Sequence, residues 1–265
     1  MAEPLILPLS KIANARDLGA YRGINGRAIK KHKLLRTAKL FNMSKSDEDF
    51  LVNYGLKKII DFRTDYECEK EPDLVPAGVE YIHLPVHADE KVGVPDRTRE
   101  NLRNTYDRDQ YAGFKLMCHQ YRKTVSAVYS QKNYYKFFEI LANNENGAIL
   151  FHCSEGKDRT GIAAVYLLYI LGVKAEVIRQ DYLYSNFGLN NYRAHIDYEA
   201  KEQGFNEYVR ANLRSLGSVA NEYLDTVKIL INKEYGGLDN YLKEKIGIDQ
   251  AMIDQLREIY LEPKN

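Results

Sequence analysis

The residues around Cys153 constrain the fold of this chain more than any other part of the sequence. The apolar run over 147–152 has the length and composition of a buried strand. Helical spacing of apolar residues starts near Thr160 and ends at Leu171, where Gly172 supplies a C-terminal cap. Residues between these segments form a loop that leaves a strand and enters a helix, an arrangement typical of α/β proteins.

The position of this loop at the start of a helix predicts an anion-binding site. Unpaired N–H groups and the helix dipole favour negative charge there, and consecutive loop amides can surround one tetrahedral oxyanion. The same field stabilises a thiolate at Cys153, and the guanidinium of Arg159 can bind two phosphate oxygens at once. The Cys-x5-Arg spacing therefore predicts a phosphomonoesterase in which Cys153 attacks phosphorus. The phosphate-binding residues are Ser154, Glu155, Gly156, Lys157, Asp158 and Arg159.

Neighbouring residues suggest supporting roles. Thr160 can donate its hydroxyl to the sulfur of Cys153 and help it leave in the second step, and the ring of His152 is expected to order the loop backbone. The alternative for the cysteine is a buried structural residue beside a strand end. A nucleotide-binding Walker loop is excluded, since Asp158 stands where Ser or Thr is required and Phe151 where the first Gly is required.

Two charged loop residues each have a functional and a structural interpretation. Asp158 is the candidate general acid that protonates the leaving oxygen, and the alternative is an ion pair with Arg16 or Arg63 that holds the loop. Lys157 is either a solvent-facing side chain or a second cation at the mouth of the site. A second cation would favour substrates with several phosphates.

Patterns elsewhere in the chain predict the rest of the fold. Further strands are expected over 58–62 and 80–86, and the C-terminal region over 205–265 reads as helical, with Asp249 as the N-cap of its last helix. Together these patterns predict an α/β fold with a central mixed sheet flanked by helices, in a single domain over 1–265.

The segment 96–130 differs in charge from its surroundings. Residues 96–123 hold seven Lys or Arg against four Asp or Glu. One reading is a solvated helical insertion, and the other is a basic flap beside an anionic-substrate site.

Composition and net charge exclude several classes of protein. The formal net charge of +1 argues against a globally basic nucleic-acid binder. Cys68, Cys118 and Cys153 are too sparse for a disulfide framework, and no Cys-x2-Cys pair indicates zinc. His83 and His87 are read as packing residues, with the alternative that one faces the site. The sequence shows neither an apolar run of membrane-spanning length nor a signal-peptide pattern. We therefore expect a cytoplasmic protein, with signal-independent export left open.

Four segments resemble the protein tyrosine phosphatase superfamily. They are the loop 153–159 with the sequence CSEGKDR, NARDLG at 14–19, IDFRTDYE at 60–67, and the helical tail that contains YGG at 235–237. The closer resemblance is to a bacterial branch of secreted tyrosine and lipid phosphatases, of the mycobacterial and listerial type. The segments span nearly the whole chain, and the loop is the most specific of them.

The resemblance implies an α/β phosphatase fold, a phosphocysteine intermediate, and neither a metal nor another cofactor. It implies action on phosphotyrosine proteins, and in some members on phosphoserine, phosphothreonine or phosphoinositides, with a helical lid that would match 96–130. Common tyrosine phosphatases carry the general acid on a Trp-Pro-Asp loop, but this chain has no Trp, and Pro95-Asp96 is the nearest remnant. The remaining candidates for the acid are Asp89, Asp96, Asp107 and Asp109.

Charged residues in the two other segments are expected behind the loop. Arg16, Asp17, Asp61 and Arg63 are predicted to support it as buried ion pairs. Alternatives for the whole chain are an inositol-polyphosphate phosphatase with the same chemistry and, more remotely, a phosphate-binding module without turnover. We expect a monomer that binds phosphorylated proteins or phosphoinositides, releases inorganic phosphate and binds no nucleic acid.

Overall fold

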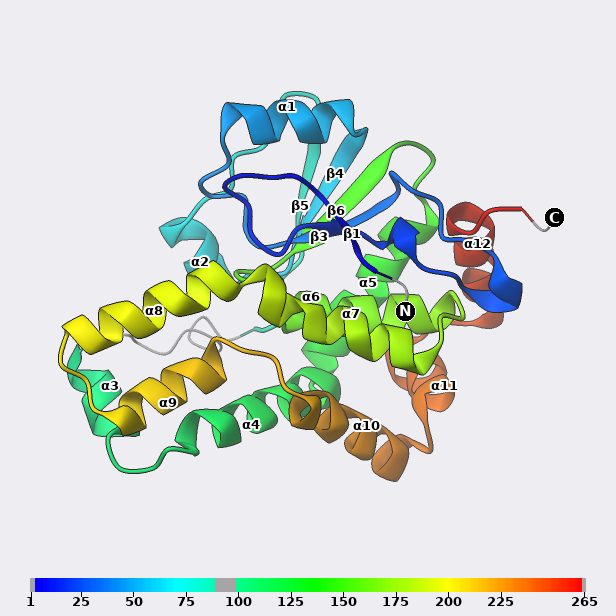
Figure 1. The fold of residues 1–265 in the computed structure, drawn as a ribbon. Coiled ribbons are helices and arrows are strands. Elements are labelled where there is room, and N and C mark those ends of the chain that lie inside the picture. The colour runs from blue at the N-terminus through cyan, green and yellow to red at the C-terminus, as the bar shows by residue number, and fades with distance from the viewer. Residues whose placement is uncertain (1–2, 89–98, 264–265) are drawn as a thin grey trace.

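A six-stranded mixed sheet forms the centre of the molecule in the computed structural model, which describes residues 3–88 and 99–263 (Figure 1). The strand order is β1-β2-β3-β6-β4-β5. Strands β3, β6, β4 and β5 are parallel, and β1 and β2 add antiparallel pairs at one edge. The bounds are β1 Leu5–Ile6, β2 Arg16–Asp17, β3 Leu34–Thr37, β4 Leu56–Asp61, β5 Glu80–His83 and β6 Ala148–His152.

Helices cover both faces of the sheet and extend beyond it (Figure 1). Their bounds are α1 Lys45–Asn53, α2 Asp65–Lys70, α3 Arg99–Tyr106, α4 Ala112–Ser126, α5 Val128–Ala142, α6 Arg159–Ile170, α7 Ala175–Gly188, α8 Asn190–Glu202, α9 Glu207–Leu216, α10 Asn221–Tyr235, α11 Leu238–Tyr241 and α12 Gln250–Tyr260. Within the described part of the chain, no helix is long and apolar enough to cross a membrane.

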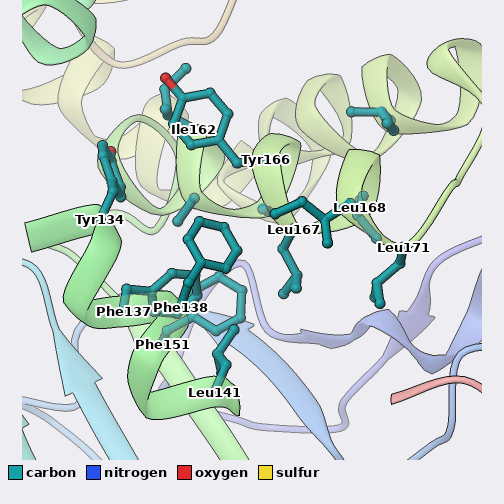
Figure 2. Packing of buried hydrophobic residues seen from close by; sticks show 14 of the residues in the cluster. Tyr134, Phe137, Phe138, Leu141, Phe151, Ile162, Tyr166, Leu167, Leu168 and Leu171 are labelled. Carbon is teal, nitrogen blue, oxygen red and sulfur yellow. The ribbon is translucent and has the colours of Figure 1, made fainter. Parts of the chain in front are cut away.

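Alternation along the parallel strands divides the core into two layers, because successive side chains of a strand point to opposite faces. Leu150 of β6 belongs to the smaller cluster, which includes Leu51 of α1. Phe151, the next residue, belongs to the larger cluster on the other face. Figure 2 shows Phe137 and Phe138 of α5 packed between Phe151 and the apolar side of α6. This packing fixes the start of α6 above the end of β6.

A third, smaller cluster joins helices that lie away from the sheet. Its buried residues come from α3, α8, α9 and the turn between α8 and α9, and α4 also packs against α9 (Figure 1). These helices include most of the predicted insertion 96–130, and its first residues, with Asp96 and Arg97, lie outside the described residues. The cluster comprises Leu102, Tyr106, Ala200, Phe205, Val209 and Leu213.

The structure confirms the predicted α/β class and contains the three predicted strands. β5 ends at His83, before the predicted end at residue 86. The predicted N-cap Asp249 accepts a hydrogen bond from the N–H of Met252 at 2.8 Å. β1 to β3 were not predicted, because two of them have only two residues each and give no pattern.

Candidate active site

The loop 153–158 leaves β6 at the edge of the sheet where the parallel strands end. His152 pairs in register with Thr37 of β3 and Asp61 of β4, so the ends of all three strands meet beneath the loop. Cys153 follows with 2% of its surface exposed, and α6 begins at Arg159. Ligands in open α/β sheets bind at this edge, and the helix N-terminus points its free amides into the loop.

Gly156 allows the loop to turn back against β3. Its φ is +64°, and a Cβ built on it would lie 1.9 Å from the carbonyl oxygen of Thr37. Any side chain would therefore clash as well as occupy a left-handed conformation. The carbonyl of Gly156 accepts hydrogen bonds from Asn14 Nδ2 at 3.1 Å and Arg36 Nη2 at 2.9 Å.

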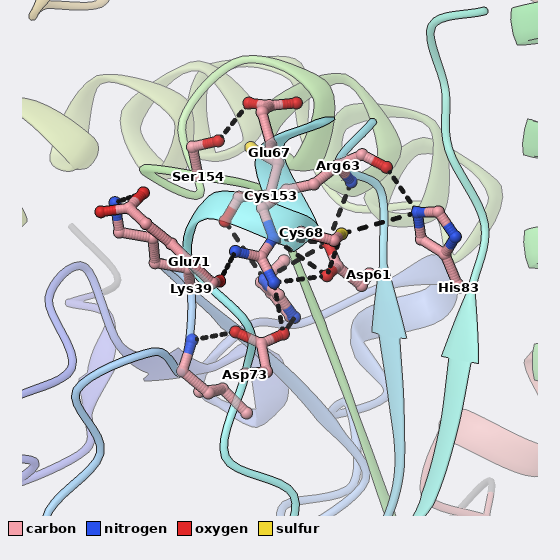
Figure 3. A network of polar contacts seen from close by, with 12 residues as sticks. Lys39, Asp61, Arg63, Glu67, Cys68, Glu71, Asp73, His83, Cys153 and Ser154 are labelled. Carbon is pink, nitrogen blue, oxygen red and sulfur yellow. Dashed lines mark hydrogen bonds and ion pairs between the residues drawn. The ribbon is translucent and has the colours of Figure 1, made fainter. Parts of the chain in front are cut away.

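Arg159 is held by a carboxylate from another element. Glu67 of α2 accepts from Arg159 Nη1 at 2.6 Å and from Nη2 at 2.7 Å. Ser154 donates its hydroxyl to the same carboxylate (Figure 3). Arg159 Nη2 also lies 3.3 Å from the Ser154 hydroxyl. A bidentate pair of this kind fixes both the position and the plane of the guanidinium.

A capping box places Glu67 there. Thr64 caps α2 through the N–H of Glu67, and Glu67 accepts in return from the N–H of Thr64 at 2.9 Å. Burial alone would raise the pKa of Glu67, but the charge of Arg159 and the hydrogen bonds lower it to about 2. Glu67 is therefore ionised whenever the protein is folded near neutral pH.

Asp181 of α7 anchors the rear of the loop. It pairs with Arg16 at 2.7 Å and Arg36 at 2.5 Å, and it accepts from the hydroxyl of Tyr21 at 3.0 Å. Burial raises its pKa, but the two arginines outweigh this effect and bring the pKa to about 2. Because Arg36 also binds the Gly156 carbonyl, this buried group connects α7 with the loop.

A second buried group lies under Cys153, below the end of β6. Asp61 receives hydrogen bonds from Arg63 Nε at 2.9 Å and Nη2 at 2.7 Å, and Arg63 also pairs with Asp73 at 2.9 Å (Figure 3). His152 pairs with Asp73 at 2.9 Å as well. Burial would raise the pKa of Asp61, but His152 and Arg63 hold it well below its usual range. Burial would lower the pKa of His152, whereas Asp61 and Asp73 raise it.

Donor atoms of Asp61, Asp73 and His152 lie within 4.8 Å of one another, which is close enough to hold a metal ion. Arg63 already binds both carboxylates, so its positive charge stands where a cation would bind. The residues fit a compensated ion-pair network and do not fit a metal centre.

Three sequence predictions, two about supporting residues and one about a loop residue, differ from the structure. Asp17 does not pair with an arginine behind the loop: it caps Gly19 and accepts from the N–H of His32 and the hydroxyl of Tyr54. Thr160 does not donate to the cysteine sulfur, because its buried hydroxyl has no hydrogen-bond partner among the described residues. It faces inward from the first turn of a buried helix.

The third difference concerns Lys157, which is neither solvent-facing nor an open cation at the mouth. Only 3% of its side chain is exposed, and its ammonium lies 2.6 Å from Asp158 Oδ2. Asp158 Oδ1 accepts from the hydroxyl of Tyr121 at 2.7 Å. The alternative partners predicted for Asp158 are engaged elsewhere, since Arg16 pairs with Asp181 and Arg63 with Asp61.

Helices from outside the sheet complete a pocket beside the loop. Glu155 and the three residues 157–159 of the loop and the start of α6 line it, and α4 and α9 supply apolar walls. His87 also lines it and lies 2.8 Å from the Thr124 hydroxyl, in agreement with the alternative that one histidine faces the site. The remaining lining residues are Met117, Gln120, Tyr121, Thr124, Ile162 and Leu216.

Of the other candidates for the general acid, two lie away from this pocket and two lie outside the described residues. Asp109 pairs with Lys115 at 2.8 Å, and Asp107 lies 3.6 Å from Arg108, both on the surface. Asp89 and the Pro95-Asp96 pair lie outside the described residues.

Comparison with known proteins agrees with this geometry. Residues 7–262 match the model of the tyrosine phosphatase family. The chain belongs to the tyrosine phosphatase family. A Nostoc commune tyrosine-protein phosphatase is 30% identical over 87% of this chain and 74% of its own. The triple specificity protein phosphatase PtpB of Mycobacterium tuberculosis is 27% identical over 88% of this chain and 92% of its own.

Two further comparisons concern another curated relative and a solved structure. A Cupriavidus necator protein named as a tyrosine-protein phosphatase is 29% identical over 96% of this chain and 88% of its own. The crystal structure of kinase associated phosphatase covers 88% of this chain and 99% of its own, with a TM-score of 0.34 and 17% identity, which is too low to support an argument. The resemblance expected from the four sequence segments is thus confirmed for the family.

Several residues of this site were not predicted from the sequence. Glu67 had a readable signal, because Thr64 and Glu67 have the spacing of a capping box, but nothing in that spacing pointed to Arg159. Tyr121 and Asp181 had no signal, since helical spacing alone explains an apolar tyrosine or a buried carboxylate on a helix.

Proposed function

We propose that this tyrosine phosphatase family member hydrolyses phosphotyrosine in proteins through a phosphocysteine on Cys153. The observation that carries the proposal is the loop at the end of β6, which holds Cys153 and the Glu67-braced Arg159 at one helix N-terminus. That arrangement can bind a tetrahedral dianion and present a thiolate to its phosphorus atom.

In the proposed first step, the sulfur of Cys153 attacks phosphorus while Arg159 and the loop amides hold the oxyanions. The ester bond breaks, and Asp158 gives a proton to the leaving oxygen. In the second step, water attacks phosphorus, the sulfur leaves as thiolate, and Asp158 takes up a proton from the water. Part of the Asp158 side chain, 26%, is exposed, as this exchange requires.

The pocket walls favour an aromatic substrate. Met117, Ile162 and Leu216 present apolar surface beside the loop, and apolar walls suit the ring of a phosphotyrosine. The name of the mycobacterial relative includes three specificities, and on this basis we propose secondary action on phosphoserine and phosphothreonine. Because Lys157 is paired with Asp158, we rank phosphoinositides and inositol phosphates below phosphoproteins.

Turnover of 4-nitrophenyl phosphate by the wild type and by Cys153→Ser tests the chemistry. We expect the variant to lose all measurable turnover while still binding phosphate, because the loop amides and Arg159 remain. Peroxide should inactivate the wild type, and thiol reductant should restore it, since oxidation of the nucleophilic sulfur first gives a sulfenic acid that thiols reduce. Retained turnover in Cys153→Ser would refute the mechanism.

Substrate class is tested by comparing kcat/KM for a phosphotyrosine peptide, its phosphoserine analogue and a short-chain phosphoinositide. We expect the phosphotyrosine peptide to be hydrolysed fastest. A phosphoinositide rate that exceeds it would reverse the ranking. Lys157→Ala would then show which class depends on that ammonium.

The remaining expectations stay part of the proposal. We propose that the chain forms one phosphatase domain over 1–265, and that α3 and α4, within 96–130, form a lid together with α8 and α9 from the second half of the chain. We further propose a monomer that requires no cofactor. Whether it acts in the cytoplasm or after export would be decided by locating the protein in fractionated cells.

A further inference from the structure

We propose that Tyr121 is the positioning residue for the general acid, so that lid helix α4 completes the acid site. The proposal rests on the function proposed above for Cys153 and Asp158. It adds a residue from outside the phosphate-binding loop, and it makes acid catalysis depend on the position of the lid.

Tyr121 is held rigidly between the loop and α7. Its hydroxyl lies 2.7 Å from Asp158 Oδ1 and 2.8 Å from the hydroxyl of Tyr182, and only 2% of the residue is exposed. Its ring meets Tyr182 edge-on and lies 5.6 Å from the ring of Tyr223. Contacts on both sides leave the hydroxyl little freedom to turn away from Asp158.

The direction of these hydrogen bonds follows from the charges. Burial and the carboxylate of Asp158 together raise the pKa of Tyr121 well above its usual value, so the hydroxyl keeps its proton. Tyr121 therefore donates its single proton to Asp158, and Tyr182 donates to the oxygen of Tyr121. This chain of donors favours one orientation of the Asp158 carboxyl group.

Fixing Oδ1 reserves the other carboxyl oxygen for proton transfer. Oδ2 is bound by the ammonium of Lys157 at 2.6 Å in the state described here. In the proposed acid form, Oδ2 has left the Lys157 ammonium and has taken a proton from solvent. It gives this proton to the leaving oxygen as the ester bond breaks, and it takes a proton from water as the sulfur–phosphorus bond breaks. Tyr121 holds its own proton through both steps and so acts through Asp158 alone.

The same contact links the acid to the lid. Tyr121 belongs to α4, which packs against α9 and α10. Tyr192 of α8 donates in a similar way to Glu155 of the loop at 3.0 Å. Two helices outside the sheet thus meet the two loop carboxylates, and a displacement of α4 would remove the hydroxyl that orients the acid.

The test compares Tyr121→Phe with the wild type on two aryl phosphates. Phenyl phosphate has a poor leaving group that needs an acid, whereas 4-nitrophenyl phosphate has a good one that needs it little. We expect kcat for phenyl phosphate to fall about 10- to 100-fold and kcat for 4-nitrophenyl phosphate to fall less than about threefold, with KM little changed in both. The control is Tyr223→Phe, which loses a hydroxyl bound to the Ser215 carbonyl. Any change in kcat in this variant should be the same for both substrates.

A double-mutant cycle with Asp158→Asn separates positioning from a general structural effect. In the Asp158→Asn background, Tyr121→Phe should have no further effect on phenyl phosphate, because the two residues act as a unit. Equal losses on both substrates, no loss on either, or additive losses in the cycle would overturn the proposal. If a thermal melt shows that Tyr121→Phe does not fold, Tyr182→Phe provides the same comparison, because Tyr182 donates to Tyr121. Equal losses of kcat on the two substrates in Tyr182→Phe would then overturn the proposal.

Failure of this proposal is distinguishable from failure of the proposed function. If Cys153→Ser hydrolyses 4-nitrophenyl phosphate as fast as the wild type, the mechanism fails whatever Tyr121 does. If turnover depends on Cys153 but Tyr121→Phe affects both substrates alike, only the positioning role fails.

Discussion

Glu67 binds both terminal nitrogens of Arg159, at 2.6 and 2.7 Å, although 92 residues separate them in the chain. The capping box of α2 orients the carboxylate, and α2 follows β4, the strand beside β6. The oxyanion-binding guanidinium is therefore positioned by the neighbouring strand and not only by its own loop.

Glu67→Gln should lower kcat/KM about 10- to 100-fold, because a neutral amide cannot hold both guanidinium nitrogens and Arg159 becomes misplaced. Steady-state kinetics with 4-nitrophenyl phosphate measure the effect. The matched control is Glu71→Gln, whose carboxylate pairs with Lys39 near the surface, and it should stay near the wild-type rate. An unchanged kcat/KM in Glu67→Gln would show that Arg159 does not need the Glu67 carboxylate to hold it in position.

Acid should unfold the protein through the buried carboxylates. The folded-state pKa of Glu67, about 2, lies below its ordinary value of 4.5, so the unfolded chain binds more protons between these values. The resulting stability, about 3 kcal/mol, is present above pH 4.5 and is lost as the pH falls toward 2. Urea unfolding across this window should show a shallower pH dependence in Glu67→Gln, and equal slopes in both proteins would contradict this.

Gly156→Ala should abolish activity and destabilise the fold. A methyl group there meets the Thr37 carbonyl at 1.9 Å, and the left-handed backbone adds about 1–3 kcal/mol of strain. Gly26→Ala is the control, since Gly26 has a φ of +73° and no atom within 4 Å of a new Cβ. We expect both variants to lose melting temperature and only Gly156→Ala to lose turnover. Full activity in Gly156→Ala would show that the loop can shift.

Asp181→Asn should destabilise the protein by about 3–5 kcal/mol, because it leaves the charges of Arg16 and Arg36 buried without compensation. Chemical unfolding measures the loss. Asp225→Asn removes the partner of Arg179 at a half-exposed site, and its cost should be less than about 1 kcal/mol. Similar losses in the two variants would argue against a special role for the Asp181 group.

Local patterns predicted a large part of this fold. Strand β6, the loop after Cys153 and helix α6 were readable because residues adjacent in sequence build them, with apolar runs and a Gly cap as signals. The Asp61–Arg63 ion pair could also be predicted from the sequence, since the two residues are close in the chain. The opposite case is Asp17, whose proximity to Arg16 suggested an ion pair, but strand alternation points the two side chains to opposite faces.

The sequence by itself determined the chemistry of this protein: a nucleophilic cysteine, an anion-binding loop at a helix N-terminus and a guanidinium six residues further on. Only the tertiary structure decided which groups control that chemistry. Glu67 reaches Arg159, Asp181 reaches Arg36 and Tyr121 reaches Asp158 because the sheet and the helices outside it bring distant segments together. Such contacts depend on how helices and strands pack together, and the local spacing of residues does not predict which elements will be in contact.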